Sequence, residues 1–380
     1  MISKISIQNF KSLKNITFEC SNLNLLTGLN GMGKSSVLQA LLLLRQSFDK
    51  GYLEKSGITL NGDLVNIGVG KDALYQNAEK EEITFNASFL QAEGTINNSW
   101  IFGYEKDSDV LLFAEDAFKN SPKPENLEIL ALFNSQFKYL HAERWVRNQY
   151  PRSDFQVVQN RSVGKHGEFA AHFLNHFGEE TIDSSLLYPG SSTNTLDYQV
   201  SAWMNEISPG TKVKTEKIRG VEAIKLSYDF PNNNGRTDEI TPGNVGFGIT
   251  YVLSVIVLLL CAKPGEILLI ENPESNLHPK GQSAIGHLMA LVAQKGVQIF
   301  VESHSDHILN GILIAISNNY KNGQGGIQSS NVKIYFFDIE NERHESISHK
   351  IEIHENGRIS KAPKNFFDQF SKDMKTIMGF

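Results

Sequence analysis

A glycine-rich run followed by lysine and serine lies near the start of this chain and has the spacing of a phosphate-binding loop. The run reads Gly28-Leu29-Asn30-Gly31-Met32-Gly33-Lys34-Ser35. Glycines allow backbone N–H groups to approach phosphate oxygens, and the dipole of a following helix favours their negative charge. We expect Lys34 to bridge the β- and γ-phosphates of ATP and the Ser35 hydroxyl to ligate Mg²⁺. The predicted nucleotide-binding residues here are Asn30, Gly31, Met32, Gly33, Lys34, Ser35 and Ser36.

A second candidate site is a carboxylate at the end of an apolar strand. The apolar run 267–270 is followed by Glu271-Asn272-Pro273-Glu274. P-loop enzymes hold Mg²⁺ and polarise water with a carboxylate in this position. Many buried strands end in Glu for structural reasons alone, but the position of this one, downstream of a phosphate loop, favours a metal site. We therefore expect Glu271 to share Mg²⁺ with Ser35.

A histidine follows the next apolar strand along the chain. The segment 299–301 is apolar, and Glu302-Ser303-His304-Ser305 comes directly after it. A lone histidine is more often an ordinary surface or core residue than a functional one. At the strand end that follows Glu271, however, the ring N–H of His304 is in a position to sense a γ-phosphate.

A second glycine-rich loop, Gly243-Asn244-Val245-Gly246-Phe247-Gly248, precedes the most apolar run of the chain, 249–262. One interpretation is a flexible loop whose glycines start a helix. The other is a helix N-terminus that presents backbone amides to a γ-phosphate held by a second subunit. On that interpretation Asn244, Gly246 and Gly248 belong to the nucleotide site.

The elements that must position these residues follow an α/β pattern. The run 23–27 predicts a buried strand before the phosphate loop, and 35–48 predicts a helix after it. Strands and helices alternate again from 241, which indicates a mostly parallel sheet. Between these parts, period-two alternation from residue 82 predicts an antiparallel meander. The expected organisation is an ATPase domain in two halves (1–145 and 241–330), an inserted α+β subdomain (146–240) and a C-terminal tail (331–380).

Composition limits the function classes. The chain has 380 residues and a formal net charge of −6, so contact with DNA or RNA would need a local basic patch or a partner. The two cysteines, Cys20 and Cys261, show no metal-binding spacing and are expected to be free thiols in a reducing cytoplasm. The apolar run 249–262 is shorter than the ~20 residues that span a bilayer, so we expect no membrane contact.

In this order, the motifs resemble those of the ATP-binding-cassette-like ATPases of the SMC, RecF and OLD (overcoming-lysogenization-defect) kind. The opening Ile5-Ser6-Ile7-Gln8-Asn9-Phe10-Lys11-Ser12-Leu13 is similar to their N-terminal strand and turn. Glu271 to Glu274 with Leu277-His278-Pro279 resembles their Walker B segment and D-loop, and His304 their switch histidine. The segment 139–144 and the tail residues 356–359 and 366–368 also resemble parts of some members.

The resemblance implies a P-loop fold of the ABC/SMC type, with a mixed sheet flanked by helices. It also implies a homodimer, or a higher oligomer, that sandwiches ATP and Mg²⁺, so that Asn244, Gly246 and Gly248 act in trans. ATPases similar to this chain accompany nucleases in Septu and related anti-phage systems of bacteria, which suggests a similar role. OLD proteins carry a TOPRIM nuclease after the ATPase; little follows residue 317 here, so we expect any nuclease to be a separate chain.

One departure from the family pattern affects the chemistry. Members usually have Asp-Glu where this chain has Glu271-Asn272. An amide cannot accept a proton, so Asn272 could only orient water. We expect slow hydrolysis, with Glu274 contributing as the base.

Three functions compete at this point. The leading hypothesis is an ATP-gated dimeric sensor or scaffold that controls a separate effector, a nuclease acting on foreign nucleic acid. The alternative is a RecF-like repair ATPase that clamps DNA directly. A transporter subunit is disfavoured because the loop 243–248 does not match the Leu-Ser-Gly-Gly-Gln signature of transporters.

Overall fold

The computed structural model describes residues 1–378 apart from 116, 121, 145–153, 192, 222 and 341–343. Its contacts divide the chain into two units, Met1–Asn134 with Val332–Phe380 and Ser135–Asn331. The predicted boundary at 145 lies outside the described residues. The predicted insert, 146–240, belongs to the second unit, and the predicted tail belongs to the first.

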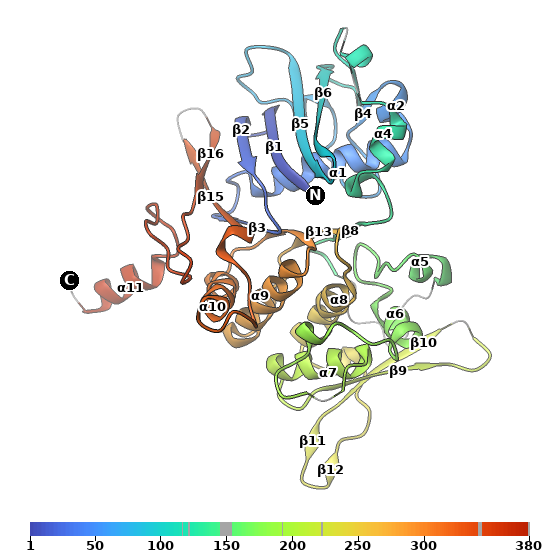
Figure 1. Ribbon diagram of the computed structural model, residues 1–380. Coiled ribbons are helices and arrows are strands. Elements are labelled where there is room, and N and C mark those ends of the chain that lie inside the picture. Colours follow the sequence, from blue (N-terminus) through green and yellow to red (C-terminus); the bar gives the residue numbers. More distant parts are fainter. Residues whose placement is uncertain are drawn as a thin grey trace. The chain divides into compact units, whose positions relative to one another are not determined.

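An antiparallel sheet with strand order β2-β1-β5-β6 forms one layer of the first unit (Figure 1). The period-two alternation of its sequence explains this arrangement, because one face of each strand is buried and the other is not. Phe10 and Phe85 pack edge to face in its core, with ring centroids 5.3 Å apart. The strands are β1 (Ile2–Phe10), β2 (Leu13–Glu19), β5 (Glu82–Gln91) and β6 (Gly94–Gly103). The predicted meander is confirmed.

The phosphate loop of the first unit lies between strand β3 (Leu23–Gly28) and helix α1 (Lys34–Asp49). Every residue of β3 is buried. Strand β15 (Val332–Glu340) pairs with β3 in parallel, and β16 (Glu345–Lys350) pairs with β15 antiparallel. The C-terminal segment is therefore part of the sheet that carries the phosphate loop. The shorter elements of this unit are α2 (Tyr52–Lys55), β4 (Gly57–Thr59), α3 (Gly70–Ala73), β7 (Val110–Leu112), α4 (Pro124–Glu128) and α11 (Gln369–Met378).

Three parallel strands form the centre of the second unit: β8 (Phe137–Leu140), β13 (Ile267–Glu271) and β14 (Gln298–Glu302). The register places Glu271 beside Glu302, so the polar residues that follow both strands emerge at one edge. Helices α9 (Pro279–Gln294) and α10 (Asp306–Asn322) begin directly after the loops at this edge and pack side by side (Figure 1).

Helix α8 (Phe247–Cys261) is buried over nearly its whole circumference. Its sequence lacks charged residues, which is why it belongs in a core rather than on a surface. In the part of the chain that the structure describes, no helix combines the length and apolarity needed to cross a membrane.

The remainder of the second unit mixes helices and small hairpins. Helix α7 (Leu196–Ile207) buries Val200, Trp203 and Met204 and packs on α8 and α9. The other elements are α5 (Phe155–Gln159), α6 (Ala170–Phe177), the β9 (Lys212–Lys217) and β10 (Ile224–Asp229) hairpin, and the β11 (Pro231–Asn232) and β12 (Gly235–Arg236) hairpin.

Glycines set the close approach of α9 and α10. A Cβ at Gly311 would lie 2.1 Å from the Ser283 carbonyl oxygen, and one at Gly286 would lie 2.3 Å from that of Ile308. Neither oxygen is the end of a flexible side chain, so the helices would have to separate to accept a larger residue.

We predict that Gly311→Ala lowers the free energy of unfolding by about 1–3 kcal/mol, because it overpacks this crossing. Urea unfolding of the purified chain measures the change. Gly243→Ala is the matched control, since a Cβ there meets nothing within 4 Å. Equal stability of the two variants would show that the helices separate at little cost.

Candidate functional site

The phosphate loop has the backbone of an anion-binding site. Gly31 and Gly33 have φ angles of +78° and +93°, which residues with a side chain rarely adopt. Gly33 caps α1, and neither a side-chain cap nor an acidic residue occupies the first turn of the helix. The start of α1 therefore presents the positive end of the helix dipole with no carboxylate of its first turn competing for an anionic ligand.

Lys34 lies within this loop rather than in solvent. Its side chain is buried, and its ammonium group donates a hydrogen bond of 2.6 Å to the Leu29 carbonyl. Asn30, Gly31 and Ser35 are exposed, whereas Ser36 is buried. The structure thus brings the predicted loop residues together around the start of α1.

Two residues far from the loop in sequence support it. A Cβ at Gly33 would lie 2.3 Å from Ser346 Oγ and 3.0 Å from Ser12 Oγ. Ser346 Oγ donates to Ser12 Oγ over 2.7 Å, and the Ser346 amide donates to the Ser12 carbonyl over 2.8 Å. The role of Ser346 could not be predicted from the sequence, because nothing local in the tail indicates a contact with the N-terminal turn.

Glu271 is held at the end of β13 by two donors. Its carboxylate accepts a hydrogen bond of 2.9 Å from the Tyr139 hydroxyl and one of 3.1 Å from the Ala142 amide. His141 Nε2 lies 3.9 Å away. Burial and the adjacent Glu271 raise the pKa of Tyr139, so this phenol stays protonated as the donor. These contacts fix the direction in which the carboxylate points.

Arg144 is the residue that fixes the backbone beyond β13. Its guanidinium is buried and donates to the carbonyls of Glu271 (2.6 Å) and Asn272 (3.3 Å). It also lies 4.2 Å from the centroid of the Tyr251 ring. Burial lowers the pKa of Arg144 to about 10, which still leaves it charged at neutral pH. The segment 139–144 was noted in the sequence, but no role was predicted for Tyr139 or Arg144.

The backbone conformation at position 272 favours an asparagine. The φ angle of Asn272 is +42°, in the left-handed region that Asn tolerates better than most residues with a side chain. Its amide donates to the Glu302 carbonyl over 2.9 Å. Among the described residues its buried Oδ1 has no hydrogen-bond partner, so this oxygen is available to orient a water molecule.

The structure brings Glu274 and His304 together through the backbone. The His304 amide donates a hydrogen bond of 2.8 Å to Glu274 Oε1, while the His304 side chain is exposed. Glu274 itself is buried, and within the described residues its Oε2 has no hydrogen-bond partner. Burial raises the pKa of Glu274, and the hydrogen bond from His304 opposes that rise.

The glycines of the loop 243–248 have two different roles. Asn244 and Gly246 are exposed, and Gly246 caps α8 without any side-chain hydrogen bond. A Cβ at Gly246 would have open space around it, with its nearest contact 3.9 Å away. A Cβ at Gly248, by contrast, would lie 2.3 Å from the Asn276 carbonyl oxygen. Gly248 is thus required for packing against the loop after Glu274, which the sequence did not indicate.

The two candidate metal ligands, Ser35 and Glu271, have donor atoms that suit Mg²⁺. A serine hydroxyl and a carboxylate are hard oxygen donors, and Mg²⁺ bound with a nucleotide needs few protein ligands. Among the described residues, no group of three or more His, Cys, Asp or Glu forms a metal site by itself.

Two protein families match the chain. Residues 23–310 match a family described as "AAA domain, putative AbiEii toxin, Type IV TA system". Residues 327–377 match a second family, described only as a protein of unknown function, DUF3696.

Individual relatives are distant. The chain is 21% identical over 363 residues to the Old nuclease of Escherichia phage P2, and the match covers 81% of this chain and 57% of that protein. The chain therefore spans little more than half the length of this relative.

Two solved structures share the fold. The SMC head bound to the C-terminal winged-helix domain of ScpA has a TM-score of 0.55 at 14% identity, covering 93% of this chain and 98% of that one. The Pyrococcus furiosus SMC head with an extended coiled coil, bound to the C-terminal domain of ScpA, has a TM-score of 0.52 at 13% identity, covering 100% and 98%. The fold is that of an SMC-type P-loop ATPase head, in which a mixed sheet is flanked by helices.

We predict that Arg144→Ala lowers the free energy of unfolding by about 2–4 kcal/mol, because it leaves two buried carbonyls without a donor. Arg144→Lys should recover only part of the loss, since a lysine cannot reproduce the forked geometry. Urea unfolding measures both, with the exposed Arg219→Ala as control. If Arg144→Ala is as stable as Arg219→Ala, the guanidinium does not hold the strand end.

Proposed function

The chain belongs to the AAA-domain family matched over residues 23–310, and from its site we propose that it hydrolyses ATP slowly as a dimer that controls a separate effector. The ATPase class follows from the family, and the SMC-like fold follows from the solved structures. The activity, the dimer and the effector are proposals.

The start of α1 is the observation that carries the proposal. Gly33 is left-handed, the first helical turn has no competing acid or side-chain cap, and Lys34 is buried against the loop. Such a helix N-terminus satisfies a phosphate group with backbone amides and a lysine. We assign ATP phosphate binding to the loop residues 30–36.

Ser35 and Glu271 are the proposed ligands of Mg²⁺, which would neutralise charge on the β- and γ-phosphates. Tyr139 and the Ala142 amide orient the Glu271 carboxylate for that role. His304, whose side chain is exposed, is proposed to sense the γ-phosphate.

The proposed dimer places Asn244 and Gly246 of one subunit at the nucleotide of the other. Both residues are exposed, and the N-terminus of α8 has no side-chain cap and no acidic residue in its first turn. These features suit an anion supplied from outside the chain. Gly248 contributes by allowing the loop to pack closely against Asn276.

Slow hydrolysis follows from the residues after β13. Asn272 cannot take a proton from water and can only orient it. Glu274 can take one, but its carboxylate is buried and one oxygen already accepts from His304. A base in this position can act only after the site rearranges to admit water. Turnover limited by such a rearrangement is typical of a molecular switch rather than of a motor.

We assign the effector role to a separate chain, a nuclease acting on phage or foreign nucleic acid. The support is the family description, which names a toxin, and the likeness of 81% of this chain to part of the Old nuclease. The setting we propose is bacterial anti-phage defence.

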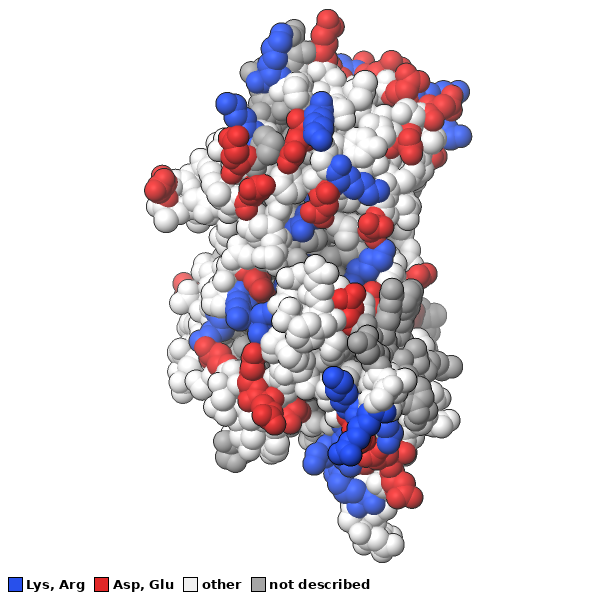
Figure 2. All heavy atoms as spheres, turned by 90° about the vertical axis from the view of Figure 1, so that its right-hand side faces the viewer, with Lys and Arg blue, Asp and Glu red and all other residues white. Residues whose placement is uncertain are grey.

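A RecF-like DNA clamp is the second candidate, and one surface feature favours it. Lys and Arg side chains gather over the β9 to β12 hairpins (Figure 2), among them the exposed Lys212, Lys217 and Arg219. Lys214 in the same region is paired with Asp229 at 2.8 Å. The partial neutralisation makes this patch weaker than a typical DNA-binding surface, so we rank the clamp second.

We predict that ATP with Mg²⁺ converts the wild-type chain to a dimer and that Lys34→Ala abolishes this conversion. The loss of a charged hydrogen-bond donor should weaken ATP binding about 10- to 100-fold. Calorimetric titration measures the affinity, and sedimentation velocity measures the dimer. Lys50→Ala, an exposed lysine just beyond the same helix, is the control. A dimer that forms equally with and without ATP would contradict the sandwich.

We predict that Glu274→Gln slows ATP turnover about 100-fold, the lower end of the effect of losing a general base. Glutamine still offers an oxygen to the His304 amide, so a purely structural role would leave the rate unchanged. Since burial raises the pKa of Glu274, wild-type turnover should fall with decreasing pH at a value above the ordinary Glu range. The variant should lack this limb in a steady-state pH profile.

A further inference from the structure

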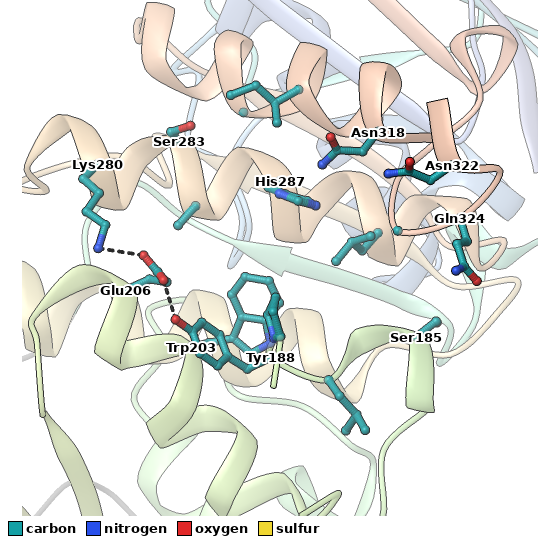
Figure 3. Close-up of a pocket in the computed structure, with 17 residues that line it drawn as sticks. Ser185, Tyr188, Trp203, Glu206, Lys280, Ser283, His287, Asn318, Asn322 and Gln324 are labelled. Atoms are coloured by element: carbon teal, nitrogen blue, oxygen red, sulfur yellow. Dashed lines mark hydrogen bonds and ion pairs between the residues drawn. The ribbon is translucent and has the colours of Figure 1, made fainter. Parts of the chain in front are cut away.

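A cavity of about 630 Å³ lies between α7, α9 and α10 in the second unit, and the residues assigned to the nucleotide do not line it. Its walls are completed by the loop residues 185–189 and 324–325. Figure 3 shows aromatic side chains on one side and amide side chains on the other. The volume is within the range of small-molecule sites, roughly 300–1,000 Å³.

The two aromatic side chains of the cavity contact each other and are held by hydrogen bonds. Trp203 and Tyr188 meet edge to face, with ring centroids 5.7 Å apart. The Trp203 indole N–H donates to the Leu186 carbonyl over 3.0 Å, and the Tyr188 hydroxyl donates to Glu206. Because the polar atoms of both rings are already bonded, the rings offer the cavity apolar surface and π-faces.

Among the described residues that line the cavity, the lysine and the carboxylate are paired with each other. Lys280 Nζ lies 2.9 Å from Glu206 Oε2 (Figure 3). Burial lowers the pKa of His287, so this ring is neutral at neutral pH. A ligand carrying a phosphate or another strong charge would lose hydration here without gaining a free counter-charge.

The facing wall carries carboxamides with open hydrogen-bonding capacity. Asn318 and Asn322 are one helical turn apart on α10, and Gln324 follows them (Figure 3). Within the described part of the chain, none of these three side chains has a hydrogen-bond partner. Each carboxamide is both donor and acceptor, so a purely aliphatic ligand would desolvate them without replacing their bonds to water.

We propose that this cavity binds a neutral, planar nitrogen heterocycle of nucleobase or nucleoside size. Ring surface matches Tyr188 and Trp203, and alternating donors and acceptors on a base edge match Asn318 and Asn322. Asparagine recognises base edges in this way in nucleic-acid complexes. The absence of a spare cation among the described lining residues selects the unphosphorylated form.

Helix α9, which forms one wall of the cavity, is connected to the nucleotide loops by hydrogen bonds of Gln282, a residue outside the cavity lining. Gln282, in the first turn of α9, donates over 2.8 Å to the Leu277 carbonyl in the loop after Glu274. The same carboxamide accepts from the Ser305 hydroxyl, which caps α10 next to His304. A ligand held between α9 and α10 therefore changes the energy of both loops. This regulatory part rests on the proposed ATPase activity, whereas ligand binding does not.

The binding test uses the full chain titrated by calorimetry with adenosine, guanosine, cytidine, uridine and thymidine. We expect at least one nucleoside to bind, and the double variant Asn318→Ala/Asn322→Ala to bind it at least about tenfold more weakly. Asn319→Ala, on the same helix but outside the cavity, should bind as wild type does. Thermal unfolding confirms that each variant is folded.

Two results would overturn the binding proposal: no nucleoside binds, or the double variant binds as tightly as Asn319→Ala. Tighter binding of the matching 5′-monophosphate would contradict the neutral ligand class. In the second arm, the bound nucleoside should change ATP turnover at least twofold in wild type and not in the double variant, whose basal rate stays unchanged. Binding of the nucleoside without a change in ATP turnover would overturn the regulatory link alone.

A chain that binds nucleoside but does not hydrolyse ATP would refute the ATPase proposal and would leave the proposed nucleoside site unaffected.

Discussion

A nucleotide's phosphates bring concentrated negative charge, and the start of α1 is where this chain can meet it. The left-handed Gly33 makes the turn from which α1 begins, and the first turn of the helix contains no acidic residue that would compete for an anion. The same glycine must lack a Cβ because Ser12 and Ser346 pack against it. The N-terminal turn and the C-terminal strands therefore support one loop from opposite ends of the chain.

The second unit has a different requirement, which is to hold carboxylates at the edge of a sheet in a fixed orientation. Arg144 donates hydrogen bonds to the backbone carbonyls of Glu271 and Asn272, and the Tyr139 hydroxyl donates one to the Glu271 carboxylate. Beyond the strand, Glu274 is tied to the amide of His304. The carboxylate proposed for the metal and the residue proposed for proton transfer thus have separate supports.

Much of this arrangement could be predicted from sequence, because the motifs are contiguous and each lies at the end of a strand. The phosphate loop, the Glu271 to Glu274 segment and His304 could be located in this way. Tyr139, Arg144 and Ser346 could not be given roles, since each acts on backbone or side chains more than 100 residues away in the chain. The pairing of β15 with β3 could not be predicted either, because the alternation of apolar and polar residues indicates a strand but not the strand with which it pairs. The packing role of Gly248 depended on knowing that Asn276 lies against it.

The central claim is that each ATP site is completed by a second subunit, and a mixing experiment tests it most directly. Lys34→Ala removes the phosphate lysine but leaves the loop 243–248 intact. Gly246→Asp does the reverse, and the open space at Gly246 allows the substitution without a clash. Each variant alone should be inactive, and an equal mixture should recover part of the wild-type turnover, because a mixed dimer has one complete site that can bind ATP and hold the two subunits together. A mixture as inactive as its components would contradict composite sites.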